Sequence, residues 1–208
     1  MGQVTKIRSR SDLIKIRDGY QKKLEGKKYK ILICSGAGCI SSNCHAVRDS
    51  LVECLEKKGL RDKVQLVETG CIGTCDLGPV MVVKNLDGTC GGEECKSVFY
   101  TKLAAKDMPG IVESHLIQEN IRMNQTYFDR KLGRNVPYIE DIDYFKNQVK
   151  IALRNCGSID YNSLEEYIAN DGYMAISKVL NEFTPQKVVD EIKRSGLKGR
   201  GGAGFPTG

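Results

Sequence analysis

Short runs of aliphatic and aromatic residues recur along the first hundred residues, separated by polar and glycine-containing segments. Runs that are rich in β-branched and aromatic side chains are typical of buried strands. Four of them predict strands: YKILIC at 29–34, KVQLVETG at 63–70, VMVV at 80–83 and SVFYTK at 97–102. The glycine-rich segment 86–95 between the last two runs predicts the tip of a hairpin.

Apolar residues spaced three and four apart predict amphipathic helices between these strands. The first helix has Ser11 as its predicted N-cap, and the second ends at Gly59. The first carries the stripe Leu13, Ile16, Tyr20 and Leu24, and the second carries Val47, Leu51, Cys54 and Leu55. The three helices are expected at 11–25, 43–59 and 108–118.

The order β-α-β-β-β-α predicts an α/β domain at 27–120, preceded by a basic helix within 1–26. Residues 121–144 are polar and contain Pro137, so we expect them to form a linker that wraps over a neighbouring surface. A second domain begins near residue 145 and occupies 145–208.

The second domain is expected to be mainly helical. Ser163 and Glu166 have the spacing of a capping box before the apolar segment LEEYIA. Thr184 and Pro185 are a predicted N-cap and first-turn proline, and Gly196 is the predicted end of that helix.

Composition excludes several classes of protein. No stretch of the 208 residues approaches the ~20 apolar residues of a membrane span. The N-terminus lacks the apolar core of a secretion signal, so we expect a soluble, cytoplasmic protein without direct membrane insertion. The net charge of +6 is concentrated in residues 1–30, which hold ten Lys/Arg and three Asp/Glu. No aromatic platform or recognition motif accompanies this charge, which argues against nucleic acid and for a solvated helix or a dock for an acidic subunit.

Nine cysteines indicate metal or redox chemistry, because an odd number in a chain without a secretion signal argues against a disulfide framework. Cys34 and Cys39 lie on the turn after the first strand, and Cys71 and Cys75 on the turn after the second. Each pair is close enough for two thiolates to reach one metal ion. Glycines at 36, 38, 70, 73 and 78 allow the backbone to fold tightly around a sulfur-rich group.

A binuclear iron–sulfur cluster takes two thiolates on each iron, which matches two pairs. A structural zinc site also takes four thiolates, but two intervening residues are usual there, whereas these pairs have four and three. A third interpretation, with no metal at all, also stays open from spacing alone.

The other five cysteines have weaker signals. Cys54 and Cys156 are expected to be structural. Cys44 repeats the C-x4-C spacing with Cys39 and is a possible competitor of Cys34 as a ligand. Cys90 and Cys95 form a further C-x4-C pair on the predicted hairpin tip, whose role stays open. The two histidines, His45 and His115, are expected to be polar surface residues.

The pattern C-x4-C, 31 residues, C-x3-C, together with the segment GCIGTCDLGPVMVV, resembles the thioredoxin-like [2Fe-2S] ferredoxin domain of respiratory complex I and of NADH-linked hydrogenases. The resemblance implies that Cys34, Cys39, Cys71 and Cys75 are the cluster ligands, with one pair on each iron.

The terminal loop GRGGAG satisfies G-x-G-x-x-G, but it follows a helix that ends at Gly196 and not a strand, so a dinucleotide fingerprint is weakly supported. The segments LRNCGSID, EYIANDGYMAISKVL and TPQKVVDEIKRSGLKGRGGAGFPTG resemble the start of the FMN-binding, 51-kDa-type flavoprotein subunit of complex I. This resemblance implies an FMN and NAD(P) pocket lined by Gly199, Arg200, Gly201, Gly202, Gly204 and Phe205.

A ferredoxin domain ahead of a flavoprotein start resembles the beta-type subunit of NAD(P)-dependent, electron-bifurcating [FeFe] hydrogenases. We therefore expect residues 1–208 to be the N-terminal part of a longer subunit, with [4Fe-4S] clusters further along and other subunits as partners. The complete subunit would be an NAD(P)H-dependent oxidoreductase in which single electrons pass between FMN and iron–sulfur clusters. Residues 1–208 alone are not expected to be catalytic.

Two other functions stay open. One is a stand-alone [2Fe-2S] electron carrier that binds its partner through the basic N-terminal helix. The other is a zinc-stabilised adaptor without redox activity.

Overall fold

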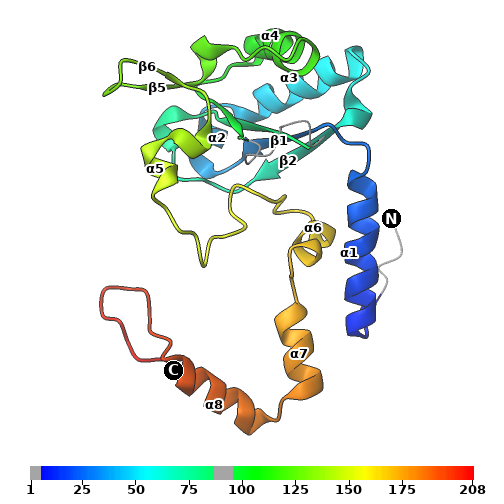
Figure 1. The fold of residues 1–208 in the computed structure, drawn as a ribbon, viewed down its shortest axis with the longest axis vertical. Coiled ribbons are helices and arrows are strands. Elements are labelled where there is room, and N and C mark those ends of the chain that lie inside the picture. The colour runs from blue at the N-terminus through cyan, green and yellow to red at the C-terminus, as the bar shows by residue number, and fades with distance from the viewer. Residues whose placement is uncertain (1–5, 87–95) are drawn as a thin grey trace.

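The computed structural model describes residues 6–86 and 96–208 (Figure 1). The predicted hairpin tip, apart from Leu86, lies outside the described residues, and so do Cys90 and Cys95. The described residues form a sheet covered by helices and a helical arm, residues 164–195, that extends away from the sheet (Figure 1).

A four-stranded mixed sheet is the centre of the α/β domain. β1 is parallel to β2, whereas β3 is antiparallel to both β1 and β4. In the spatial order β2-β1-β3-β4, the strands are Val64–Thr69, Tyr29–Cys34, Met81–Asn85 and Val98–Tyr100. The four strands predicted from the apolar runs are confirmed. They form because their aliphatic side chains are buried; in β1 only Lys30 is not fully buried.

Helices α3 (Cys44–Lys57) and α4 (Met108–Ile111) pack together over one face of the sheet (Figure 1). The stripe predicted for α3 is confirmed, because its inward face buries Val47, Leu51 and Leu55. The helix predicted at 108–118 is confirmed in position, but its second half is a π-helix, at Val112–Ile117. Short 3-10 turns among the described residues lie at Arg61–Lys63, Cys75–Leu77, Ala105–Asp107, Met123–Gln125 and Ile139–Asp141.

Helix α1 (Arg10–Leu24) is capped by Ser9, so the predicted cap at Ser11 is wrong. The Ser9 hydroxyl accepts from the amide of Asp12 at 3.3 Å, and the Asp12 carboxylate accepts from the amide of Ser9 at 3.1 Å. This reciprocal pair satisfies two N–H groups at the helix start, and it forms only when the acidic residue lies three positions after the cap. On the predicted stripe, Leu13 is fully buried.

Residues 121–144 lie along the outer edge of the sheet. They contain a hairpin of β5 (Tyr127–Asp129) and β6 (Arg134–Val136), and the short helix α5 (Asp143–Lys146) follows. Isolated bridges join Thr126 to Tyr100 and Tyr138 to Val98, so this segment covers strand β4.

His115 is not a surface residue, contrary to expectation. Its Nδ1 lies 2.9 Å from the Tyr100 hydroxyl, and burial lowers its pKa to about 4. The imidazole is therefore neutral at physiological pH, and from its place in the π-helix it contacts Tyr100 of β4.

The helical arm consists of α6 (Leu164–Ala169), α7 (Met174–Glu182) and α8 (Pro185–Ser195). α6 and α7 contact α1, while no described residue from 173 onward is buried (Figure 1). The caps predicted for α8 are confirmed: Thr184 accepts from the amide of Lys187, and Gly196 has a φ of +60°. Within 6–86 and 96–208, no helix has the length and apolar content that a bilayer crossing requires.

Glu166 attaches the arm to the sheet. Its amide donates to the Ser163 hydroxyl, but its carboxylate accepts from Lys30 Nζ at 2.7 Å and from the Asp160 amide at 3.0 Å. The predicted capping box is therefore wrong in its second half, and the Ser163 amide donates to the Asp160 carbonyl instead. The Glu166 side chain is 3% exposed and Lys30 16%, so each buried charge depends on the other.

We expect Glu166→Ala to lower the free energy of unfolding by about 3 kcal/mol, because it leaves Lys30 as an unpaired buried cation. The matched control is Glu165→Ala, which removes an exposed ion pair with Lys23 and should change stability by less than about 0.5 kcal/mol. Urea unfolding followed by circular dichroism measures both. Equal losses in the two variants would contradict the role of Glu166 as the attachment point.

Candidate metal centre

Cys34 and Cys39 lie on either side of the turn that leaves β1. Cys34 is the last residue of the strand, and Cys39 lies in α2 (Ala37–Ser41). Both side chains are almost completely buried. The sequence does not predict α2, because a five-residue helix that contains a glycine is too short to show a helical periodicity.

Cys71 and Cys75 lie on the turn that follows β2, and both are exposed. Their sulfur atoms are 3.5 Å apart, and the Gly73 amide donates to Cys71 Sγ at 3.3 Å. Gly73 has a φ of +92°, a conformation that only glycine adopts readily, so this residue type allows the turn to aim an N–H group at the sulfur.

The two turns meet at one edge of the sheet. β1 and β2 are adjacent parallel strands, so both turns leave from their carboxyl ends. Glycine permits the close approach: a side-chain carbon at Gly36 would lie 2.8 Å from Cys71 Cβ, and one at Gly38 would lie 3.1 Å from Cys75 Sγ. The structure thus brings together the four cysteines that the spacing singled out.

The four thiols influence one another electrostatically. Burial raises the pKa of Cys34 to about 12, and the neighbouring thiols of Cys39 and Cys71 add to that increase, while the Gly36 amide opposes it. A hydrogen bond with the Cys71 thiol, and the charge of that group, raise the pKa of the exposed Cys75. Several thiolates cannot share this space without a cation, and a bound metal supplies the compensating positive charge.

The donor set fits a sulfur-ligated binuclear centre. Thiolates are soft ligands, suited to iron–sulfur clusters and zinc. Here they come as two pairs from two separate turns, and each iron of a binuclear cluster takes one such pair. Among the described residues, no three His, Cys, Asp or Glu side chains form a group that could hold one metal ion.

The other described cysteines differ in environment. Cys44, the first residue of α3, is completely buried; burial and the nearby Cys34 raise the pKa of its thiol, while a hydrogen bond with Ser35 opposes this. Cys54 is half-buried on the face of α3 that packs on the core.

Cys156 lies beside the candidate centre, a position that its sequence neighbourhood does not indicate. Its thiol donates to the Cys71 carbonyl at 2.8 Å, and the next amide, of Gly157, donates to the Thr69 hydroxyl at 3.1 Å. These contacts join positions 85 and 88 residues apart, so no local pattern in the chain could have revealed them.

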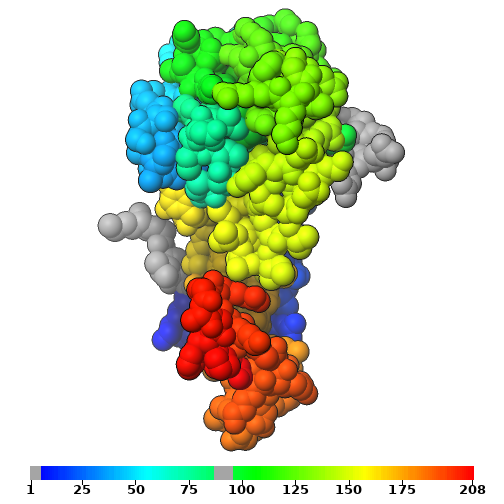
Figure 2. Space-filling model, turned by 90° about the vertical axis from the view of Figure 1, so that its left-hand side faces the viewer, coloured from blue at the N-terminus to red at the C-terminus, as the bar shows by residue number. Residues whose placement is uncertain are grey.

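The predicted nucleotide loop is a closed turn at the end of α8. The Gly199 amide donates to the Phe205 carbonyl at 2.7 Å, and Lys198 forms a bridge with Pro206. The six predicted residues all lie in this turn: Gly199, Arg200, Gly201, Gly202, Gly204 and Phe205. The Phe205 ring is 71% exposed. In Figure 2 the loop (red) is on the same face as the two cysteine turns (light blue and teal), with the segment around residues 145–160 (yellow) between them.

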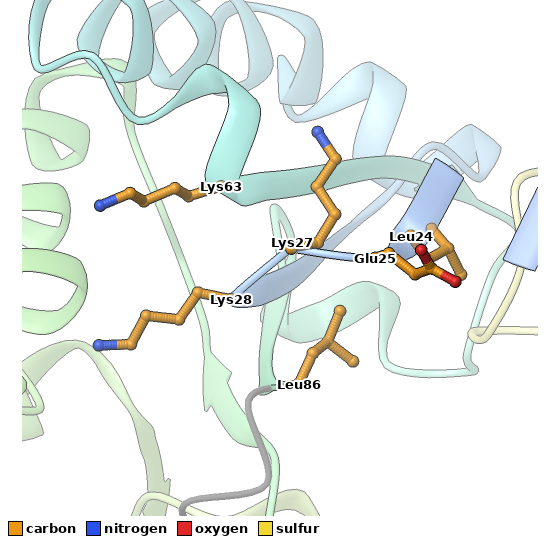
Figure 3. A pocket seen from close by; sticks show the side chains of 7 residues that line it. Leu24, Glu25, Lys27, Lys28, Lys63 and Leu86 are labelled. Atoms are coloured by element: carbon orange, nitrogen blue, oxygen red, sulfur yellow. The ribbon is translucent and has the colours of Figure 1, made fainter. Parts of the chain in front are cut away.

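A pocket of about 580 Å³ lies away from the cysteines, near the amino end of β1 (Figure 3). Its polar lining comes mostly from Lys27, Lys28 and Lys63, and Lys28 is paired with Glu119 at 2.5 Å. It does not share residues with the candidate centre.

Two comparisons with known proteins concern the α/β domain. The family of thioredoxin-like [2Fe-2S] ferredoxins matches residues 17–114. A solved structure, the thioredoxin-like [2Fe-2S] ferredoxin from Aquifex aeolicus, is 20% identical and superimposes with a TM-score of 0.39 over 48% of this chain and 89% of the other.

Curated relatives are components of NAD(P)H-linked oxidoreductases. The NADP-reducing hydrogenase subunit HndC of Solidesulfovibrio fructosivorans is 62% identical over 63 residues, which is 30% of this chain and 13% of the relative. A NADH-quinone oxidoreductase subunit of Rhizobium meliloti is 50% identical over 58 residues, 28% of this chain and 14% of the relative. A NADH-quinone oxidoreductase subunit of Aquifex aeolicus is 39% identical over 75 residues, 36% of this chain and 17% of the relative. The chain thus spans less than a fifth of the length of these relatives.

We expect Gly36→Ala to separate the two cysteine turns, because the new methyl group would overlap Cys71; overpacking of this kind costs about 1–3 kcal/mol. Iron and acid-labile sulfide retained per chain should fall well below the wild-type values. Gly19→Ala is the control, because Gly19 lies on α1 and a methyl group there would meet no atom within 4 Å. This variant should leave the iron and sulfide contents unchanged. Full iron and sulfide content in Gly36→Ala would contradict the close approach of the turns.

Two lines of observation agree on the class of this domain. The mixed sheet carries four thiols at the carboxyl ends of its parallel strands, and the family match covers that sheet and the helices that flank it. Residues 17–114, just under half of the chain, match the family of thioredoxin-like [2Fe-2S] ferredoxins.

Proposed function

We propose that Cys34, Cys39, Cys71 and Cys75 hold a [2Fe-2S] cluster, with Cys34 and Cys39 on one iron and Cys71 and Cys75 on the other. The observation that carries this proposal is the meeting of two thiol pairs at adjacent parallel strand ends, across glycines that leave no room for side chains. Such a cluster takes up and releases single electrons. The chain's own contribution is to bury the Cys34 pair, expose the Cys71 pair and direct the Gly73 amide at sulfur.

We further propose that the chain is an electron-transfer module of an NAD(P)H-dependent oxidoreductase of the NADH dehydrogenase or hydrogenase type. The names of its relatives support this class. The sequence identity is higher to the hydrogenase subunit, at 62%, than to the NADH-quinone oxidoreductase subunit of Rhizobium meliloti, at 50%. This difference favours hydrogenase-type partners over respiratory ones. In the complete subunit, FMN would exchange a hydride with NAD(P)H and pass on single electrons, and [4Fe-4S] clusters would extend the route.

We propose the terminal loop, Gly199 to Phe205, as a part of the FMN and NAD(P) pocket in the complete subunit. Support comes from its glycines, its Arg200 cation and its exposed Phe205 ring. The corresponding domain division is a basic helix within 1–26, the ferredoxin domain at 27–120, a connecting segment at 121–144 and the start of a flavoprotein domain at 145–208. Other subunits of the complex are the proposed partners, and the proposed location is cytoplasmic, in keeping with an odd number of cysteines.

We expect Cys71→Ser and Cys75→Ser each to abolish the visible absorption of the cluster in protein purified without oxygen. Cys54→Ser is the matched control, because Cys54 is half-buried on α3 in the core, and it should keep the wild-type spectrum. Cys90→Ser should keep it as well. If Cys71→Ser and Cys54→Ser gave the same spectrum, the proposed ligand set would be wrong.

We expect residues 1–208 to bind neither FMN nor NADH with useful affinity, because a single exposed glycine loop offers a small part of the surface that normally surrounds a cofactor. Isothermal titration with FMN and with NADH measures this directly. Flavin that co-purifies in an amount equal to the polypeptide would overturn the expectation, and would place the whole flavin site within these residues.

A further inference from the structure

The segment 144–157, which includes most of α5 and part of the connection from α5 to the helical arm, lies against the turn that carries Cys71 and Cys75. We call it the crossing segment. A side-chain carbon at Gly73 would overlap the Tyr144 hydroxyl, and one at Gly157 would overlap Ile72. Two glycines, one on each side, therefore allow the crossing segment and the cysteine turn to touch.

Cys156 makes the central contact between them. Its thiol donates to the Cys71 carbonyl at 2.8 Å. Its sulfur also packs close to Gly70, where a side-chain carbon would lie 3.4 Å from it, at van der Waals distance. The Gly157 amide donates to the Thr69 hydroxyl, which is itself buried. The crossing segment is closed on itself as well, since Lys150 Nζ donates to the Cys156 carbonyl at 3.3 Å.

We propose that Cys156 is a positioning residue that fixes the Cys71 turn through its hydrogen bond to the Cys71 carbonyl, and that this bond sets the redox potential of the cluster. This inference rests on the proposed function, because it takes Cys71 as a ligand. Cys156 is not assigned as a ligand itself, since its thiol proton is engaged by the carbonyl.

The physical reason lies in the exposure and flexibility of the turn. Cys71 is exposed and lies next to Gly70, with Gly73 two residues further on, so the backbone of this turn gains rigidity from its contact with the crossing segment. Hydrogen bonds near the ligand sulfurs of a cluster favour the reduced, more negative state and so raise the potential. The Cys156 thiol donates to the carbonyl of Cys71 itself, withdraws electron density from that ligand and so also raises the potential. Loss of this donor should make the cluster harder to reduce.

The contact also connects two regions of the chain. The crossing segment continues into α6, where Glu166 is bound to Lys30 of β1. The helical arm and the terminal loop follow directly. Residues 156 and 157 thus link the chain just before the arm to the backbone of a proposed cluster ligand.

The test compares Cys156→Ala with Cys156→Ser in the full chain, purified without oxygen. Redox titration followed by electron paramagnetic resonance gives the midpoint potential and the g values. At the midpoint potential of the wild type, we expect the ratio of reduced to oxidised cluster in Cys156→Ala to be about threefold lower. The full net free energy of one hydrogen bond would change this ratio roughly fivefold, and only part of it acts on the cluster. Cys156→Ser keeps a donor and should recover most of the shift. Cys54→Ala, a half-buried cysteine substitution on α3, should leave the midpoint unchanged.

A second measurement does not depend on the cluster. Hydrogen exchange of the backbone amides in 69–75, measured on the cluster-free full chain, should be about fivefold faster in Cys156→Ala than in wild type. Cys156→Val, which also lacks a donor but fills the space, serves in place of alanine if that variant does not fold. A wild-type chain that binds no cluster would refute the proposed function. The exchange rates would still show whether Cys156 restrains the turn in that case. A donor-free variant that kept both the wild-type midpoint and the wild-type exchange rate would overturn the inference.

Discussion

The structure depends on the parallel pairing of β1 with β2. Parallel strands leave a sheet at the same edge, so the turns after Cys34 and after Thr69 meet there without further guidance. Four thiols are thereby brought to one edge of the sheet, where burial raises the pKa of Cys34 to about 12 and the neighbouring thiols of Cys39 and Cys71 add to the increase. Glycine at positions 36 and 38 is the second requirement, because a side chain at either would push the turns apart. Strand order and residue size together produce the site.

Much of the fold could be predicted from the chain because its signals are local. The strands are short, apolar and bounded by polar residues, and the caps of α8 are formed by adjacent residues. The four cysteines could be singled out for the same reason, since each pair lies within one turn. Apart from the cap of α1, which is Ser9 and not Ser11, prediction failed mainly where partners are distant in sequence. The carboxylate of Glu166 has the spacing of a local capping box, yet it binds Lys30, 136 residues away, because two buried charges stabilise each other more than the box would. Nothing in the sequence around Cys156 links it to Cys71, so a structural role is all that the chain alone predicts for it.

The same long-range contacts determine how the two regions of the chain are related. The four-stranded sheet and the helical arm are joined by a buried ion pair on one side and by the crossing segment at the cysteine turn on the other. Beyond α6 the arm and the terminal loop expose large apolar side chains, with Leu180 of the arm 77% exposed and Phe205 of the loop 71%. The arm is thus held to the sheet near its base, next to the proposed ligands, while its far end and the glycine loop face the surroundings.

The central claim is that two thiol pairs hold a binuclear iron–sulfur cluster. Metal and sulfide analysis of the full chain, produced with ample iron and purified without oxygen, tests it most directly when combined with electron paramagnetic resonance after dithionite reduction. The account predicts about two iron and about two acid-labile sulfide per chain, with a signal from the reduced cluster. One zinc per chain with no sulfide and no signal would contradict it.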